Sequence, residues 1–219
     1  MKLFIKDVIR NACFYPFAFS RTVFFNFLRH QTNNNGKCSY FLFSRYAIFE
    51  IHKSAKVILN GLVWFGVKKV KSSHNETCLW MGENSTLEVN GGQIFNGCDI
   101  QVFNNAHLRI GKCSINRNVQ ILCMDNIYIG DDCLISRDVV IRDNDGGHTI
   151  LVDNYKKTSP VYIGNHVWIG QGAIIMKGVK IGDGAIIGAN SFVASNVKPN
   201  SLVMCDSSRT FAKDIVWKE

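Results

Sequence analysis

The stretch RDNDGGHTI, residues 142–150, places a histidine shortly after two aspartates. An imidazole, with an ordinary pKa of about 6.5, can accept a proton near neutral pH while a carboxylate holds its second ring nitrogen. His148 is therefore a candidate general base. Asp143 and Asp145 are candidates to orient it, and the sequence does not decide between them.

The cysteines offer a second kind of reactive side chain, but their spacing argues against a metal or redox site. The eight occur without any C-x-x-C pair, at positions 13, 38, 78, 98, 113, 123, 133 and 205. No base adjoins Cys123 or Cys133 in the sequence, so we expect them to be buried rather than nucleophilic. We expect all eight to be reduced thiols of a cytosolic protein.

A six-residue repeat indicates the elements that must position these residues. Every sixth residue from 163 to 193 is aliphatic, namely Ile163, Ile169, Ile175, Ile181, Ile187 and Val193. The residues two positions earlier are small or β-branched, which is typical of a short strand whose alternate side chains point the same way. Glycine at 164, 170, 182 and 188 predicts sharp bends with backbone angles that other residues avoid. Strands this short are stable only when stacked, so the repeat predicts a β-solenoid.

The phase of the repeat also predicts a loop and the limits of the domain. Ile129, Ile135 and Ile141 obey it, but the series then breaks and resumes only at Ile163. The chain is therefore expected to expel a loop over residues 146–161. Before residue 129 the rhythm loosens, which predicts irregular coils beginning near residue 48. We expect an N-terminal helical appendage over 1–47, the solenoid over 48–203 and a capping segment over 204–219.

The N-terminal segment is basic and aromatic. Residues 1–30 carry eight aromatic side chains and several lysines and arginines, and Pro16 divides them into two short predicted helices. Such helices either lie on a membrane surface or cap the domain and join subunits. The net charge of +8 favours anionic partners. Of these we expect a membrane surface and a phosphorylated ligand, not nucleic acid.

Two stretches resemble the hexapeptide-repeat acyltransferases, in particular the sugar and polysaccharide O-acetyltransferases related to galactoside acetyltransferases. They are IGDDCLISRDVVIRD and HVWIGQGAIIMKGVKIGDGAIIGANSFVAS, and the resemblance is strongest over 127–195. It implies an all-β solenoid, a left-handed parallel β-helix, that forms a homotrimer. It also implies direct acetyl transfer from acetyl-CoA to a hydroxyl of a cell-surface polysaccharide, lipopolysaccharide or capsule precursor. We expect a cytoplasmic enzyme, peripheral at the inner face of the membrane, without a metal.

The resemblance also implies roles for particular residues. The family's catalytic histidine matches His148, and its asparagine matches Asn116 or Asn118, with Asp145 as a further catalytic candidate. The implied contacts to acetyl-CoA come from Trp168, Gly170, Gln171, Ala189 and Arg209. Because CoA carries several phosphate charges, Lys177, Lys180 and Lys198 are further basic candidates. The backbone N–H of Gln171 would stabilise the charge on the thioester oxygen. The chain departs from the family at CDSSR, 205–209, where many relatives have Gly-x-Pro-Ala-Lys.

Three other functions compete with this interpretation. A γ-class carbonic anhydrase would share the scaffold, but His107, His148 and His166 lack the closely spaced pair that binds its zinc. An amine acceptor, in an amino sugar or in serine, would make the chain an N-acetyltransferase or a serine acetyltransferase-like enzyme. A binding solenoid without activity is the third alternative.

Overall fold

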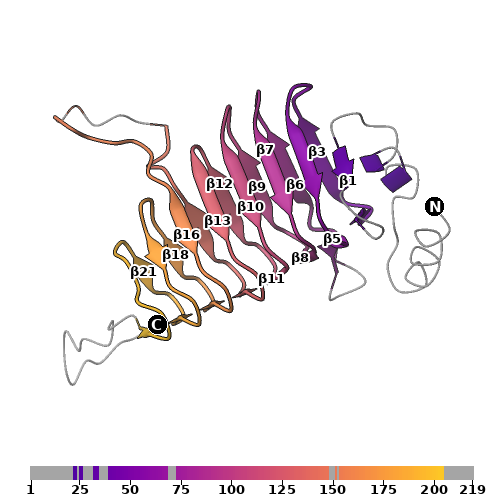
Figure 1. The fold of residues 1–219 in the computed structure, drawn as a ribbon. Helices are drawn as coiled ribbons and strands as arrows, with labels where there is room; N and C mark the ends of the chain where they lie inside the picture. Colours follow the sequence, from indigo (N-terminus) through magenta and orange to yellow (C-terminus); the bar gives the residue numbers. More distant parts are fainter. Residues whose placement is uncertain are drawn as a thin grey trace, which may run out of the picture.

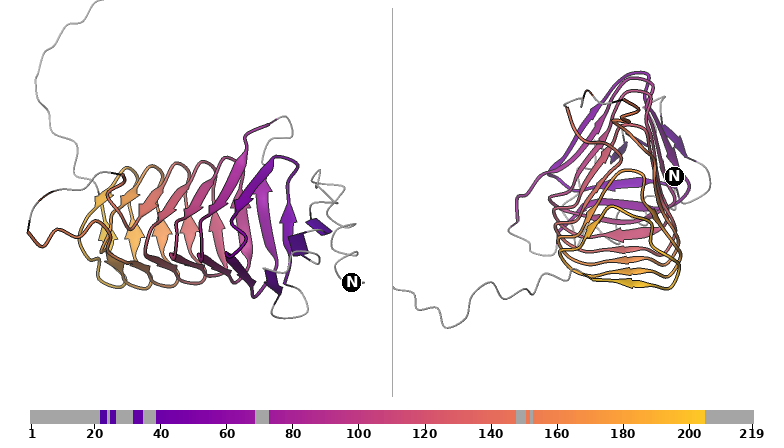
Figure 2. Two further views of the ribbon diagram at one scale, coloured as in Figure 1. Left: turned by 90° about the horizontal axis from the view of Figure 1, so that it is seen from above. Right: turned by 90° about the vertical axis from the view of Figure 1, so that its left-hand side faces the viewer.

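The structure, a computed structural model, describes residues 22–23, 25–26, 32–34, 39–68, 73–147, 151 and 153–204. Within them the chain winds into stacked coils whose three faces are parallel sheets, as Figure 1 and Figure 2 show. The fold is the left-handed parallel β-helix that the resemblance implied. Each turn of the chain contributes one strand to sheet A, one to sheet B and one to sheet C.

From β1 to β21 each sheet is built from every third strand along the chain, and β22 follows β20 in sheet B. Sheet A contains β1 (Thr32–Asn34), β4 (Lys56–Leu59), β7 (Thr86–Val89), β10 (His107–Ile110), β13 (Asn126–Ile129), β16 (Val161–Ile163) and β19 (Lys180–Ile181). Sheet B contains β2 (Phe41–Phe43), β5 (Val63–Val67), β8 (Gly92–Phe95), β11 (Cys113–Ile115), β14 (Leu134–Ile135), β17 (Trp168–Ile169), β20 (Ile186–Ile187) and β22 (Leu202–Val203). Sheet C contains β3 (Ala47–Ile51), β6 (Thr77–Met81), β9 (Asp99–Val102), β12 (Gln120–Cys123), β15 (Val140–Arg142), β18 (Ile174–Ile175) and β21 (Phe192–Val193).

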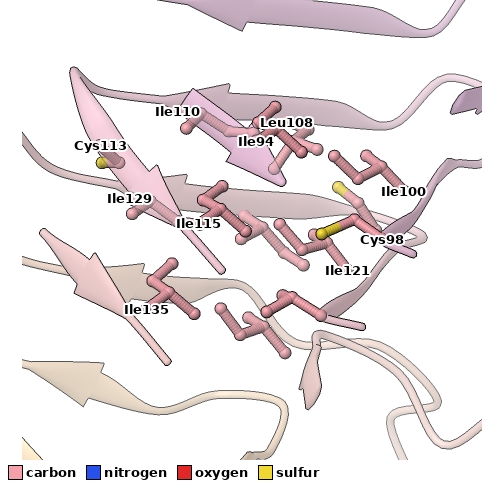
Figure 3. Packing of buried hydrophobic residues seen from close by; sticks show 14 of the residues in the cluster. Ile94, Cys98, Ile100, Leu108, Ile110, Cys113, Ile115, Ile121, Ile129 and Ile135 are labelled. Carbon is pink, nitrogen blue, oxygen red and sulfur yellow. The ribbon is translucent and has the colours of Figure 1, made fainter. Parts of the chain in front are cut away.

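The stacked coils form a prism whose three sides are the three sheets, and the aliphatic residues of the six-residue repeat point into it. The aliphatic residues from Ile163 to Val193 are all buried, and so are the small residues two positions before each. Ile163 pairs with Ile181 and Ile169 with Ile187, so in this part of the chain one coil consists of three repeats. Like residues therefore stack directly over one another in continuous columns. Figure 3 shows the same inward packing for the earlier coils, where Cys98 and Cys113 lie among isoleucines.

The corner glycines are required for a reason other than the one predicted. Gly164 and Gly170 do not have positive φ angles; those occur two residues later, at His166 and Gly172. A Cβ on Gly170 would lie 2.6 Å from the backbone nitrogen of Ala189 on the next coil. Successive coils approach too closely at this position for any side chain, so the constraint is contact rather than backbone angle.

The solenoid begins earlier than the predicted residue 48, and the three sheets continue through the coils before residue 129, with one register shift between Phe65 and Val67. β1 and β2 already pair with β4 and β5. The upstream coils are longer than three repeats, as the pairing of Leu108 with Ile127 and of Leu87 with Leu108 shows. The strands of these coils are also longer, with three to five residues against two in β17–β21, so the inward positions fall out of the six-residue phase while the sheets continue.

The N-terminal residues that are described cap the first coil. Helical residues occur at 22–23 and 25–26. The Phe25 ring lies 5.0 Å from that of Phe43, edge to face, at the end of the core. Asn26 donates to the carbonyl of Phe41 and accepts from its N–H, both at 2.8 Å. Residues 1–21, 24, 27–31, 35–38 and 205–219, which include most of the predicted appendage and capping segment, lie outside the described residues. No described helix has the length and hydropathy needed to cross a bilayer.

The predicted loop leaves the prism between sheets C and A. β15 ends at Arg142 and β16 begins at Val161, so residue 161 belongs to the sheet rather than to the loop. Figure 1 shows the segment projecting well beyond the coils. An antiparallel bridge between Asn144 and Thr158 closes its base.

Because inward and outward residues alternate along a strand, mutations of neighbouring residues should differ in their effect on the free energy of unfolding. Ile175 is fully buried, whereas Ile174 on the same strand is 36% exposed. Ile175→Val is expected to lower the free energy of unfolding by about 0.5–1.5 kcal/mol, because it leaves a small cavity in a packed column. Ile174→Val, the matched control, is expected to change it by less than about 0.5 kcal/mol. Urea denaturation measures both, and equal losses would contradict the inward assignment.

Candidate active site

The base of the loop is held to the coil below it by Asp143. This buried carboxylate accepts hydrogen bonds from the backbone N–H groups of Met124 and Asp125, each at 2.8 Å. Asn144 donates to one of the same oxygens at 3.1 Å and to the carbonyl of Leu122 at 2.8 Å. Asp143 thus fixes the stalk of the loop, and its oxygens are already occupied by these donors.

Asp145 belongs to a tether between the loop and the next coil. Tyr155 donates its hydroxyl proton to Asp145 Oδ2 at 2.6 Å, and the Lys177 ammonium donates to the same oxygen. Lys177 also donates to the carbonyl of Lys156 and lies 4.6 Å from the centre of the Tyr155 ring. Lys177 was expected to contact acetyl-CoA, but its contacts are with the loop. We call Asp145, Tyr155 and Lys177 the loop clamp.

The loop clamp is stable across the neutral pH range. Hydrogen bonds from Lys177 and from Tyr155 hold the pKa of Asp145 below its usual range, and the bond to Asp145 raises the pKa of Tyr155. A carboxyl with a lowered pKa contributes stability above its ordinary value of about 4, and that contribution is lost as the pH falls through the lowered value. The phenol remains a donor beyond its ordinary pKa of about 10.

Tyr155→Phe is expected to loosen the loop without unfolding the prism, because it removes one hydrogen bond to Asp145. We expect faster proteolysis within residues 146–160 and a few-fold lower turnover, with unchanged urea denaturation of the coils. Limited proteolysis of wild type should show constant loop protection from about pH 5 to 9 and loss of protection only in acid. Tyr162→Phe, on the outer face of sheet A, is the matched control. Equal proteolysis of the two variants would contradict the clamp.

Corner amides between sheets A and B are capped by side chains of the following coil. The N–H groups of Lys112, Asp131 and Asn165 donate to the side-chain oxygens of Asp131, Asn165 and Asp183, at 2.7, 2.8 and 2.7 Å. Each aspartate or asparagine thus satisfies the amide directly below it, and the corner forms a ladder of caps.

The corner between sheets B and C lacks such a cap at Gln171. Gln171 occupies the place of Asn165, and the residue above it is Ala189, which has no side-chain acceptor. Among the described residues no hydrogen-bond partner is found for the Gln171 N–H, and Gln171 is exposed. By contrast, the Gly170 N–H donates to the carbonyl of Ile187 at 2.7 Å. Of the two amides predicted to contact the thioester, only that of Gln171 is therefore available.

Several predicted residues surround this open amide. Trp168 lies on the outer face of sheet B, 51% exposed, with its indole N–H 3.4 Å from the Ser136 hydroxyl. The Gln171 side chain donates to Asp138, which also accepts from Asn118 at 3.1 Å. The structure thus gathers Trp168, Gln171, Ala189 and Asn118 at the B–C corner.

The two asparagine candidates have structural roles at this corner. Asn116 accepts the N–H of Arg117 at 2.9 Å. Asn118 has a φ angle of 59°, a conformation that asparagine tolerates better than most residues. Strand β15 runs from the B–C corner to the corner where the loop leaves. The asparagines and the loop therefore lie at opposite edges of sheet C within one chain.

The remaining predicted residues divide between other surfaces and the undescribed segments. Lys180 lies on sheet A, 5.7 Å from the centre of the Tyr162 ring, and Lys198 is exposed. His148 and Arg209 lie outside the described residues. His166 lies at the A–B corner, whereas the loop clamp lies at the C–A corner and the Gln171 amide at the B–C corner. Within the described ranges, no group of three or more His, Cys, Asp or Glu side chains could hold a metal ion.

Tyr155 and Asp138 are the residues that sequence reasoning missed. Tyr155 lies within the expelled loop, where no repeat phase indicates its neighbours. Asp138 lies at the B–C corner on the coil below Gln171, and an exposed corner position carries no chemical signal of its own. The missing cap could have been found from the sequence. Position 189 follows 171 by 18 residues, as 183 follows 165, and it carries alanine where 183 carries aspartate.

Comparison with known proteins places the chain. The family described as bacterial transferase hexapeptide (six repeats) matches residues 160–195. The putative lipopolysaccharide biosynthesis O-acetyl transferase WbbJ of Escherichia coli strain K12 is 30% identical over 141 residues, which cover 59% of this chain and 68% of that protein. The chain belongs to the hexapeptide-repeat transferases.

Two further relatives align over a smaller share of their length. The galactoside O-acetyltransferase of Escherichia coli strain K12 is 31% identical, over 61% of this chain and 63% of that protein. The chloramphenicol acetyltransferase of Klebsiella aerogenes is 32% identical, over 49% of this chain and 51% of that protein. The chain thus spans less than two thirds of either. The crystal structure of the polySia specific acetyltransferase NeuO aligns with a TM-score of 0.47 at 22% identity, over 86% of this chain and 89% of that one.

Proposed function

We propose that this chain is an O-acetyltransferase that transfers the acetyl group of acetyl-CoA to a sugar hydroxyl of a cell-surface polysaccharide, lipopolysaccharide or capsule precursor. The observation that carries the proposal is the uncapped N–H of Gln171 below Ala189. The amides of Lys112, Asp131 and Asn165 at the A–B corner are capped, and an exposed free donor suits a thioester oxygen. The names of the relatives support the sugar acceptor.

In the proposed mechanism His148 takes the proton of the attacking hydroxyl. A sugar hydroxyl is a poor nucleophile near neutral pH, so direct attack on a thioester needs a base. His148 follows Asp145 of the loop clamp by three residues in the sequence. The oxygen–carbon bond forms as the thioester carbonyl becomes tetrahedral, and the Gln171 N–H donates to its oxygen. The carbon–sulfur bond then breaks, and the proton held by the imidazole leaves with the CoA thiolate.

We further infer a homotrimer whose active sites lie between subunits. The loop and the Gln171 amide belong to different corners, so a neighbouring subunit would supply the half that each corner lacks. A ladder of exposed apolar side chains on sheet B supports an interface there: Leu134, Trp168, Ile186 and Leu202, 56%, 51%, 37% and 60% exposed, pair in register. Apolar patches of this kind mark contact surfaces.

We also infer a cytoplasmic location, with the N-terminal segment near the inner face of the membrane. The cysteines within the described ranges, at 78, 98, 113, 123 and 133, are free thiols, which fits a reducing compartment. The basic and aromatic composition of residues 1–30 fits an anionic surface.

A thiol-release assay tests the proposed activity. Purified chain is mixed with acetyl-CoA and a panel of oligosaccharides that carry hydroxyl acceptors only or an added amine. We expect free CoA with the hydroxyl acceptors and an acetyl ester in the product. A binding solenoid would release no CoA, and release only with amine acceptors would show an N-acetyltransferase.

A further inference from the structure

The outer face of sheet C carries two adjoining hollows near the N-terminal end of the prism. The first, about 410 Å³, is lined by strands β3, β6 and β9, with Glu50, Trp80, Asp99, Gln101 and Phe103 among its residues. The second, about 420 Å³, shares Glu50 and Trp80 with it and extends to the corner where strands turn toward sheet A. A volume of this order accommodates a small ligand.

The lining combines aromatic rings with hydrogen-bond acceptors. The Trp80 and Phe103 rings lie 5.3 Å apart, inclined by 58°. Gln101 donates to Asp99 at 2.9 Å, which fixes both side chains. Among the described residues, no hydrogen bond or ion pair is found for the Glu50 carboxylate. An apolar ring face bordered by fixed acceptors matches a sugar ring, which presents C–H groups on its faces and hydroxyl groups around its edge.

The first hollow, which contains Trp80 and Phe103, is negatively charged because Glu50 and Asp99 line it, although the chain has a net charge of +8. Burial raises the pKa of the Cys78 thiol in its wall, and the charges of Asp99, Glu76 and Glu50 raise it further. These carboxylates would repel an anionic sugar and would favour a neutral or amino-bearing one.

The hollow lies on the same face as the base of the loop. In register across sheet C, Trp80 pairs with Gln101, Gln101 with Leu122 and Leu122 with Arg142. At about 4.8 Å per strand, Trp80 is about 14 Å from Arg142, the residue where β15 ends and the loop begins. The buried Nε of Arg142 has no hydrogen-bond partner among the described residues, so an unpaired donor lies at the loop end of this row.

We propose that this row on sheet C is an acceptor track, with the Trp80–Phe103 hollow binding a neutral or amino-bearing sugar ring several units away from the ring that is acetylated at the loop. The proposal rests on the proposed function and makes it more specific. The acceptor is an oligosaccharide or polymer rather than a monosaccharide, and the rings that contact the hollow carry no negative charge.

The test measures glycan binding and acetyl transfer separately on the full chain. Trp80→Ala removes the ring, Glu50→Gln removes only charge at an exposed position, and Tyr128→Ala, an outward aromatic residue on sheet A, is the control. The probes are neutral hexasaccharides (maltohexaose, cellohexaose and chitohexaose), the glucosamine hexamer and an α2,8-linked sialic acid hexamer. Isothermal titration without acetyl-CoA gives the affinities. Thiol release gives kcat and KM for each hexamer and its monosaccharide.

We expect a neutral or amino hexamer to bind wild type, and Trp80→Ala to weaken that binding and raise its KM about tenfold, as one lost stacking contact would. The monosaccharide kinetics and the KM for acetyl-CoA should not change. Glu50→Gln should weaken the glucosamine hexamer most. Unchanged binding in Trp80→Ala, strongest Trp80-dependent binding of the sialic acid hexamer, or no binding by any probe would overturn the track. Trp80-dependent binding without acetyl transfer would leave the track standing and overturn the proposed function.

Discussion

His148→Ala is expected to reduce the rate of acetyl transfer about 10²–10⁴-fold, the usual contribution of a positioned general base. Binding of acetyl-CoA should not change, because the thioester contacts proposed here belong to the B–C corner. The measurement is kcat from thiol release at saturating acetyl-CoA, together with the affinity for CoA. The residual rate should also lose the dependence on pH near the ordinary pKa of imidazole, about 6.5.

His166→Ala is the matched control for this prediction. His166 is an exposed corner histidine with a φ angle of 55°, at the A–B corner, where neither half of the proposed site lies. Its replacement should leave the activity near that of wild type. Full activity in His148→Ala would remove the histidine from the mechanism, whatever His166→Ala does.

Ala189→Asn is expected to lower kcat about 10²–10³-fold, the cost of removing one donor from an oxyanion site. Asparagine at 189 would supply the cap that Asn165 supplies at the equivalent place on the A–B corner, where it accepts the N–H of Asp131. The Gln171 N–H would then be occupied within the protein and unavailable to the thioester oxygen. The fold should gain rather than lose stability, since one more corner amide is satisfied.

Ala189→Val separates capping from bulk. Valine, like asparagine, is larger than alanine, but it has no acceptor, so it leaves the Gln171 N–H free. We expect a much smaller loss of kcat in Ala189→Val than in Ala189→Asn, in parallel thiol-release assays. Equal losses in the two variants would show that residue 189 acts through space filling alone, and would contradict the role given to the Gln171 amide.

Co-expression of the His148→Ala and Ala189→Asn chains tests whether the site lies between subunits. Chains with His148→Ala keep an intact B–C corner, and chains with Ala189→Asn keep an intact loop. In a ring of subunits with head-to-tail contacts, equal co-expression should restore about one quarter of the active sites by random pairing. If one chain supplied the whole site, the mixture would be as inactive as its components.

The fold between Ile163 and Val193 was predictable because the coils there have the same length. From Ile163 to Val193 the inward positions keep a six-residue phase, and all of them are buried. Upstream the same architecture continues through longer coils, where Leu87 and Leu108 remain stacked although the phase is lost. Phe41, Phe43 and Phe65 fill the first coils in place of isoleucine and valine. A search for aliphatic residues at a fixed spacing therefore does not find where the solenoid begins.

The site was predictable in part, since sequence spacing locates a corner but not what occupies it. Trp168, Gln171 and Ala189, which the resemblance proposed as contacts to acetyl-CoA, lie at the B–C corner. Lys177 contacts Asp145 instead of facing outward, because the loop folds back on it, and nothing in a repeat predicts where an expelled segment returns. The hollow around Trp80 combines residues from three successive coils, and those coils lie in the region where the phase was lost.

A stack of parallel strands ends in strands whose backbone N–H and C=O groups can pair with a further strand. At the first coil, β1, β2 and β3 are the outermost strands of their sheets, and an uncovered outermost strand can pair with another molecule. Phe25 and Asn26 prevent this at β2, one by covering the apolar opening and the other by occupying both backbone groups of Phe41. These two residues thus close the stack at β2 against the backbone of another molecule.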